Sequence, residues 1–171
     1  MRALQTYRPE AAGPLNRLAN VLLRGTETFP AAERELIGTF VSSRNDCYYC
    51  QTIHGAVAAC HLGGNEDLVQ QVKSDPETAP VSERLKALLA IAAKVQQGGK
   101  AVTQAEIERA RQAGASEFDI HDTVLIAAAF CMFNRYVDGL ASWAPSDPEF
   151  YRERGAYLAR NGYSFAASPS K

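Results

Sequence analysis

Long hydrophobic runs are missing from this sequence of 171 residues. The longest apolar stretch, residues 124–133, is well short of the roughly 20 residues that a membrane-spanning helix needs. Residues 1–8 also lack the continuous apolar segment that is typical of a signal peptide. We therefore expect no membrane association and a cytoplasmic protein, in a compartment where thiols are normally kept reduced.

An excess of charge of either sign is missing as well. Lys and Arg number 18 and Asp and Glu number 19, and opposite charges often stand side by side, as in Arg152, Glu153 and Arg154. Such a surface has no basic stripe that could follow a phosphate backbone, so we expect no nucleic-acid partner. The apolar content of 46% is that of an ordinary globular protein, and the length fits one domain with a real core.

The alternation of apolar and polar residues that marks β-strands is hardly present. Helix-forming residues dominate the periodic stretches, which predicts an all-α fold in a compact multi-helix bundle. Residues 1 to about 12 are expected to form an extended arm. The expected helix starts or caps are Pro14, Pro30, Asp46, Ser82, Thr103, Ser116 and Pro148.

Four cysteines are present, and two of them form a C-x-x-C motif, Cys47 and Cys50, with His54 four residues further on. In a helix running from Cys47 to about Leu62, these spacings place the three side chains on one face. The positive end of the helix and the imidazole both favour a thiolate, whereas Asp46 opposes it. One thiol of such a pair can attack a substrate while the other resolves the adduct as a disulfide. Cys47, nearer the helix start, is expected to be the more exposed of the two.

Two other interpretations of these residues compete with redox chemistry. Zinc ligation by Cys47, Cys50, His54 and Cys60 or His61 is disfavoured, because Cys47 and His61 would be separated by about 21 Å along one straight helix. We therefore expect no metal and no other cofactor. The second alternative is an inert, core-facing thiol pair.

The remaining cysteines and histidines are expected to be structural. Cys60 points to another side of its helix, Cys131 belongs in the core, and His121 belongs at the surface.

Asn134 and Arg135 lie in the middle of an apolar helix, which predicts a buried polar partner for them. Asp138, one turn further along, is a candidate for that partner.

These residues together resemble a known family. Residues 35–38 (Glu-Leu-Ile-Gly), the Cys47–Cys50–His54 motif and residues 133–140 (Phe-Asn-Arg-Tyr-Val-Asp-Gly-Leu) are similar to the alkylhydroperoxidase D-like (AhpD-like) branch of the carboxymuconolactone decarboxylase family. The chain as a whole looks closest to the subgroup of peroxidase-related proteins. The resemblance divides it into an N-terminal arm and helix (1–27), an AhpD-like core (28–140) and a C-terminal helix and tail (141–171). The Ser- and Ala-rich end from Ser164 is expected to be frayed.

The resemblance also implies site roles and partners. Glu35 would polarise His54, His54 would lower the proton affinity of Cys50, and Cys47 would be the partner thiol. Tyr49 stands where well-studied members can have a second histidine, so this chain lacks a second imidazole at the dithiol. The family also implies a homo-oligomer, as a dimer, trimer or hexamer. The decarboxylase branch lacks the cysteine pair, so decarboxylation is not expected.

Three functions follow from this sequence. The leading hypothesis is a thiol-dependent peroxidase that reduces a small-molecule hydroperoxide and is regenerated by a dithiol or protein reductant. The alternative is a disulfide oxidoreductase or redox sensor that acts on a protein partner. The third is a helical assembly module whose thiols do no chemistry.

Overall fold

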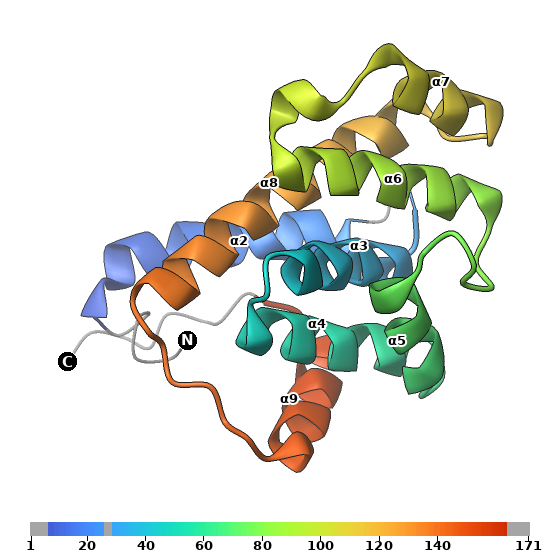
Figure 1. The fold of residues 1–171 in the computed structure, drawn as a ribbon. Coiled ribbons are helices and arrows are strands. Elements are labelled where there is room, and N and C mark those ends of the chain that lie inside the picture. The colour runs from blue at the N-terminus through green and yellow to red at the C-terminus, as the bar shows by residue number, and fades with distance from the viewer. Residues whose placement is uncertain (1–6, 26–28, 164–171) are drawn as a thin grey trace.

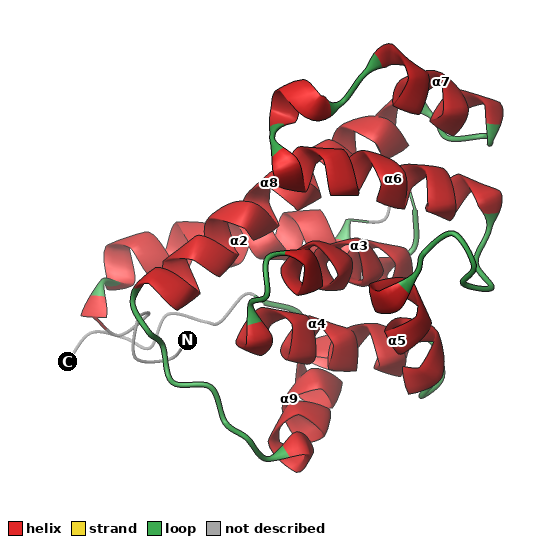
Figure 2. Cartoon of the chain, viewed as in Figure 1, coloured by secondary structure: helices red, strands yellow, loops and turns green. Residues whose placement is uncertain are grey.

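The structure of the protein is a computed structural model that describes residues 7–25 and 29–163. Within these residues every regular element is a helix, and the helices pack into a single domain, so the all-α prediction is confirmed (Figure 2). The elements are α2 (Pro9–Arg24), α3 (Ala31–Arg44), α4 (Tyr48–His61), α5 (Glu66–Ser74), α6 (Glu83–Gln97), the 3₁₀ turn η1 (Gly99–Ala101), α7 (Gln104–Gln112), α8 (Glu117–Gly139) and α9 (Pro148–Asn161).

Helix α3 is the centre of the packing. It lies against α4 on one side and against α6 and α8 on another, and it buries Leu36, Ile37 and Phe40 in the main hydrophobic core (Figure 1). Helix α9 packs on α4 on the side away from α6 and α7 (Figure 1). The C-terminal part of the chain thus lies against the helix that carries the C-x-x-C motif.

Local capping chemistry explains most of the helix starts. The Ser82 hydroxyl accepts a hydrogen bond from the Leu85 backbone N–H at 3.1 Å, which satisfies one of the unpaired donors at the start of α6. Thr103 and Ser116 form capping boxes that begin α7 and α8. These starts were predicted from the sequence, as were those at Pro30 and Pro148.

The predicted start of the first described helix was wrong. Helix α2 begins at Pro9, so residues 9–12 are helical rather than part of an extended arm. Both prolines have the backbone angle that a helix needs, and Pro14, in the second turn, costs the helix one backbone hydrogen bond. The remainder of the expected arm (1–6), the expected boundary at 27/28 and the expected frayed end from Ser164 lie outside the described residues.

Asp46 does not cap α4, contrary to the sequence prediction. It has a φ of 55° and ends α3, because its N–H donates to the Ser43 carbonyl while the Cys47 N–H donates to the Ser42 carbonyl. This pair of bonds is a Schellman motif, whose closing residue has a left-handed backbone conformation. An N-cap residue has an extended conformation instead, so Asp46 cannot fill both positions. Cys47, with φ −81° and ψ 95°, is the N-cap of α4 instead.

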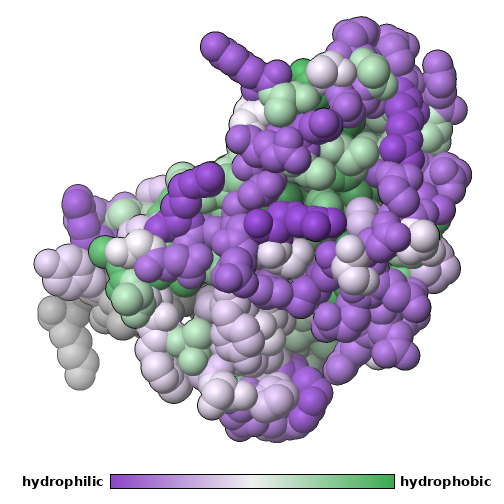
Figure 3. Space-filling view, in the orientation of Figure 1, coloured by the Kyte–Doolittle hydropathy of each residue, from purple (hydrophilic) through white to green (hydrophobic). Residues whose placement is uncertain are grey.

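The surface is mostly hydrophilic on the face seen in Figure 3, and hydrophobic residues gather at the edge near the C-terminal end of α8. None of the described helices combines the length and the apolar character needed to cross a membrane.

Candidate active site

The two cysteines of the motif lie at the junction between α3 and α4. Cys47 belongs to both the end of α3 and the start of α4, and Cys50 follows in the first turn of α4. Both side chains are buried, with 0% of Cys47 and 2% of Cys50 exposed. The expectation that Cys47 would be the more exposed thiol was therefore wrong. Cys47 is buried because Val137 of α8 packs against both cysteines. These three residues form a small hydrophobic cluster separate from the main core.

The two thiols differ in acidity. A hydrogen bond from the Cys47 thiol is the main influence that lowers the pKa of Cys50, and the charge of His54 acts in the same direction against burial. The same hydrogen bond, together with burial, raises the pKa of Cys47 well above its usual range. The pair therefore favours a Cys50 thiolate beside a protonated Cys47, and the thiolate is the nucleophilic form of cysteine.

Two polar side chains of α8 complete the surroundings of the dithiol. The Asn134 amide donates to the Ser42 hydroxyl at 3.0 Å and accepts from Asn45 at 2.8 Å, and a further hydrogen bond to Cys50 lowers the pKa of that thiol. Asn134 thus has the buried partners that the sequence predicted, but Asp138 is not among those found. The Cys47 thiol donates to Asp138 Oδ1 instead, at 3.2 Å.

Glu35 of α3 and His54 of α4 are in direct contact. His54 Nδ1 lies 2.9 Å from Glu35 Oε2, and the glutamate side chain is fully buried. A carboxylate accepts, so the Nδ1 atom carries a proton in this contact, and Nε2 is the ring nitrogen left to gain or release a further proton. The edge of Phe130 packs against the imidazole, with the ring centroids 4.7 Å apart.

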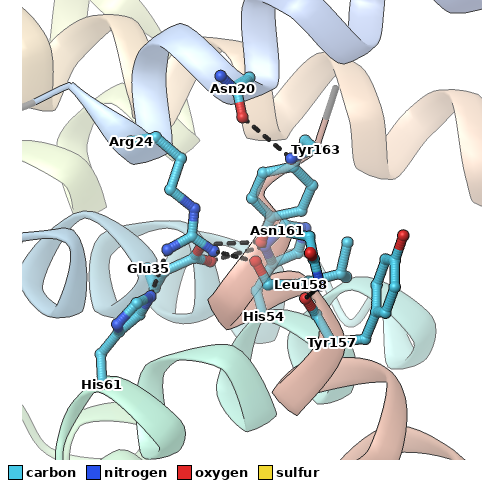
Figure 4. A network of polar contacts seen from close by, with 9 residues as sticks. All are labelled: Asn20, Arg24, Glu35, His54, His61, Tyr157, Leu158, Asn161 and Tyr163. Carbon is cyan, nitrogen blue, oxygen red and sulfur yellow. Dashed lines mark hydrogen bonds and ion pairs between the residues drawn. The ribbon is translucent and has the colours of Figure 1, made fainter. Parts of the chain in front are cut away.

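Tyr163, just beyond the end of α9, joins Glu35 and His54 in one network. Its hydroxyl donates to Glu35 Oε1 at 2.7 Å and lies 3.1 Å from His54 Nδ1, and its ring stacks on the imidazole (Figure 4). Burial, and next the charge of Glu35, raise the pKa of Tyr163 well above its usual value, so the hydroxyl stays protonated and can donate. The Asn20 side chain accepts from the Tyr163 backbone N–H at 3.0 Å and holds this segment on α2.

Arg24 of α2 balances the buried charge of Glu35. Its Nη2 atom lies 3.6 Å from Glu35 Oε1 and donates to the Leu158 carbonyl, while its Nη1 atom contacts the ring of His61 (Figure 4). A buried carboxylate without such partners would be costly, which explains why Glu35 is tolerated in the core. His61 thus has the structural position expected for it.

A cavity of about 820 Å³ opens beside the network. Cys50, His54 and Tyr163 lie in its wall, whereas Cys47 does not. Apolar residues make up most of the remaining wall: Ala12, Leu15, Ala19, Leu23, Ile53, Phe130, Phe133, Leu140, Ala141, Trp143, Pro145, Phe150 and Leu158. Tyr49 is also in the wall, so it shapes the cavity beside the dithiol.

Three further cysteine and histidine side chains do not line the cavity: Cys60, Cys131 and His121. Cys60 is exposed, Cys131 is buried in the main core, and His121 is exposed beside Asp122. Among residues 7–25 and 29–163, no three His, Cys, Asp or Glu side chains are arranged to hold a metal ion.

Sequence reasoning did not name Tyr163 among the site residues, and it assigned Asp138 to the wrong partner. Tyr163 lies 128 residues from Glu35, and Asp138 lies 91 residues from Cys47. No local pattern links residues at such separations. The polar residues within 134–138 of an otherwise apolar helix did indicate that this part of α8 makes buried polar contacts.

No protein-family model and no curated protein matches this chain. Solved structures are similar to it, among them the following two. An uncharacterized peroxidase-related protein from Silicibacter sp. TM1040 is 28% identical, with a TM-score of 0.73 over 83% of this chain and 72% of that one. An uncharacterized peroxidase-related protein from Ralstonia eutropha JMP134, with an alkylhydroperoxidase AhpD core, is 24% identical, with a TM-score of 0.79 over 90% of this chain and 78% of that one. The chain therefore has the AhpD-like fold of peroxidase-related proteins, as its sequence motifs predicted.

Proposed function

We propose that this protein is a thiol-dependent peroxidase that reduces organic hydroperoxides with Cys50 as the attacking thiolate. One observation carries the proposal: the cysteine whose pKa is lowered is the one in the cavity wall, beside a histidine that contacts a buried glutamate. The AhpD-like, peroxidase-related fold supports the same general role.

The first chemical step forms a sulfenic acid. In the resting site His54 holds the proton of Cys50, and Glu35 stabilises the resulting imidazolium. The thiolate attacks the terminal oxygen of the hydroperoxide, the O–O bond breaks, and the departing alkoxide takes the proton from His54. Cys50 is oxidised to the sulfenic acid, and the hydroperoxide is reduced to an alcohol.

The second step closes a disulfide between Cys47 and Cys50 and releases water. An external dithiol then returns the pair to the reduced state, by attack of its thiolate on the disulfide and release of its own disulfide. The cavity gives such a reductant a path to Cys50, because Cys50 lies in its wall.

The shape of the site favours a hydroperoxide over a protein disulfide as the oxidant. Both sulfur atoms are buried, so the disulfide of a folded partner would not reach them without rearrangement of α4 or α8. A hydroperoxide is small enough to enter the cavity, and the apolar wall suits its organic part. A disulfide oxidoreductase or redox sensor is the second candidate.

We also propose a cytoplasmic location and self-association. All four cysteines are free thiols in the structure, which suits a reducing compartment. Phe118, Leu125 and Met132 are exposed on α8 at intervals of seven residues, which places them on one side of the helix, and this side is the proposed contact between copies.

Disulfide mapping after treatment with one equivalent of tert-butyl hydroperoxide tests the proposed function. We expect a Cys47–Cys50 disulfide and loss of one hydroperoxide per chain, with Cys60→Ser as the matched control that behaves like the wild type. A Cys60–Cys131 disulfide, or hydroperoxide left unconsumed, would refute the proposal. Oxidation by protein disulfides but not by hydroperoxides would favour the oxidoreductase.

A further inference from the structure

The dithiol has two chemically different sides. Cys50 faces the cavity with His54, whereas the Cys47 thiol points to α8 and donates to Asp138 Oδ1 at 3.2 Å. Asp138 is exposed, and it lines a second, smaller pocket of about 380 Å³ together with polar neighbours that include Asn45 and Asn134. A carboxylate at the surface can exchange protons with water, so a proton route leads from the buried Cys47 thiol to solvent.

The end of α8 holds Asp138 in this position. Ala141, with a φ of 47°, closes the helix, because its N–H donates to the Asp138 carbonyl while the Ser142 N–H donates to the Val137 carbonyl. These two bonds form a Schellman motif, like the one that ends α3, and it fixes the last turn of the helix. Val137, in the same turn, packs with both cysteines, so the carboxylate and the thiol keep their relative positions.

We propose that Asp138 is the general base that takes the proton of Cys47 when the disulfide closes. This assignment rests on the proposed peroxidase function and adds a catalytic residue to it. As the Cys47 sulfur attacks the Cys50 sulfur, the S–S bond forms, the S–O bond breaks and the Cys47 proton passes to Asp138. The departing hydroxide takes a proton from solvent to give water, and Asp138 returns its proton to solvent.

The resolving step needs a base of its own. In the reduced pair the single proton of Cys47 has two acceptors, the Cys50 sulfur and Asp138. Oxidation of Cys50 removes the first of these, because a sulfenic acid is no longer an anion. Burial still raises the pKa of Cys47 after Cys50 is oxidised, so this buried thiol needs a base to take its proton near neutral pH.

His54 is poorly placed to serve Cys47. It lies one turn beyond Cys50 in the wall of the cavity, and its Nδ1 atom is engaged with Glu35 and Tyr163. Cys47 does not line that cavity. The arrangement therefore gives each thiol a separate proton acceptor on its own side, His54 for Cys50 and Asp138 for Cys47.

The test follows the two steps separately in a single turnover. Reduced wild type and Asp138→Asn are mixed with tert-butyl hydroperoxide, the Cys50 sulfenic acid is trapped with dimedone at timed intervals, and the disulfide is measured by mass. We expect sulfenic acid to form at least as fast in Asp138→Asn as in the wild type, because the charge of Asp138 raises the pKa of Cys50. It should then accumulate, with closure slowed about 10²-fold or more, as for the loss of a general base. Asp67→Asn, an exposed aspartate on α5, is the matched control and should close at the wild-type rate.

Rescue separates a proton acceptor from a merely structural residue. Added formate should speed closure in Asp138→Ala, because a small carboxylate can occupy the vacated position, and Asp138→Glu should retain much of the closure rate. Closure at the wild-type rate in Asp138→Asn, or equal slowing of both steps, overturns the assignment of Asp138. Absence of sulfenic acid and disulfide in the wild type overturns the proposed function instead, so the two failures are distinguishable.

Discussion

The Tyr163 hydroxyl donates to Glu35 Oε1 at 2.7 Å and anchors the carboxylate that contacts His54. This bond ties the segment beyond α9 to α3, so the site is completed by a residue outside the Cys-x-x-Cys helix. It also gives a fully buried carboxyl group a hydrogen-bond donor.

Tyr163→Phe removes this donor and keeps the ring that stacks on His54. A hydrogen bond to a charged group contributes about 1.5–3 kcal/mol, so we expect oxidation of Cys50 by hydroperoxide to slow about tenfold or more. Stopped-flow rates on the reduced protein would measure the effect. Tyr157→Phe, an exposed tyrosine on α9, is the control, and equal rates in the two variants would show that Tyr163 has no part in positioning Glu35.

His54 and Glu35 are expected to act as a unit. His54→Phe should raise the pKa of Cys50 and slow its oxidation about 10²–10⁴-fold, the range typical of general acid–base groups. Glu35→Gln should slow it as well, and the double variant should lose less than the two losses combined. Ultraviolet titration of the thiolate and single-turnover rates on the three variants decide the matter. Additive losses would mean that the two residues act independently.

Gly155 of α9 lies against α4 with no room for a side chain. A Cβ atom at this position would lie 2.7 Å from Ala56 Cβ and 3.0 Å from the Ala56 backbone carbon. Gly155→Ala should therefore lower the free energy of unfolding by about 1–3 kcal/mol. It should also slow the oxidation of Cys50, because α9 leads to Tyr163. Gly99→Ala, with no atom within 4 Å of the added carbon, is the control in denaturant unfolding. Equal stability of the two variants would argue against close α4–α9 packing.

The sequence predicted correctly those features that depend on residues close together in the chain. Ser82, Thr103 and Ser116 mark helix starts within three or four residues, and the spacing of Cys50 and His54 needs only one helix. The error in the first helix arose because Pro9 and Pro14 can each stand at a helix start. The error at Asp46 arose because Asp46 and Cys47 can each be the N-cap.

The site could not be completed from the sequence because its remaining members come from other helices. Tyr163 reaches Glu35 only after α9 packs on α4, and Asp138 reaches Cys47 only after the end of α8 packs on the dithiol. Neither pairing leaves a periodic pattern in the chain.

Self-association is expected through the exposed apolar side of α8. Sedimentation at micromolar concentration should give a species larger than the 18.6 kDa chain. Met132→Glu should shift it toward the monomer, because Met132 is 43% exposed and a charge there opposes burial between copies. Gln70→Glu, an exposed change on α5, is the matched control. A monomeric wild type would contradict the proposal of an oligomer.

The pH dependence of hydroperoxide reduction by the reduced protein is the most direct test of the account. Stopped-flow mixing with tert-butyl hydroperoxide can use the fluorescence of Trp143, the single tryptophan, which lies in the same cavity wall as Cys50. Since the pKa of Cys50 is lowered, the rate should reach its plateau at a pH below the value of about 8.5 that governs an unperturbed cysteine. Cys50→Ser should abolish the reaction, and Cys47→Ser should stop at the sulfenic acid. A reaction that survives in Cys50→Ser, or that follows the pH dependence of an ordinary thiol, would contradict the account.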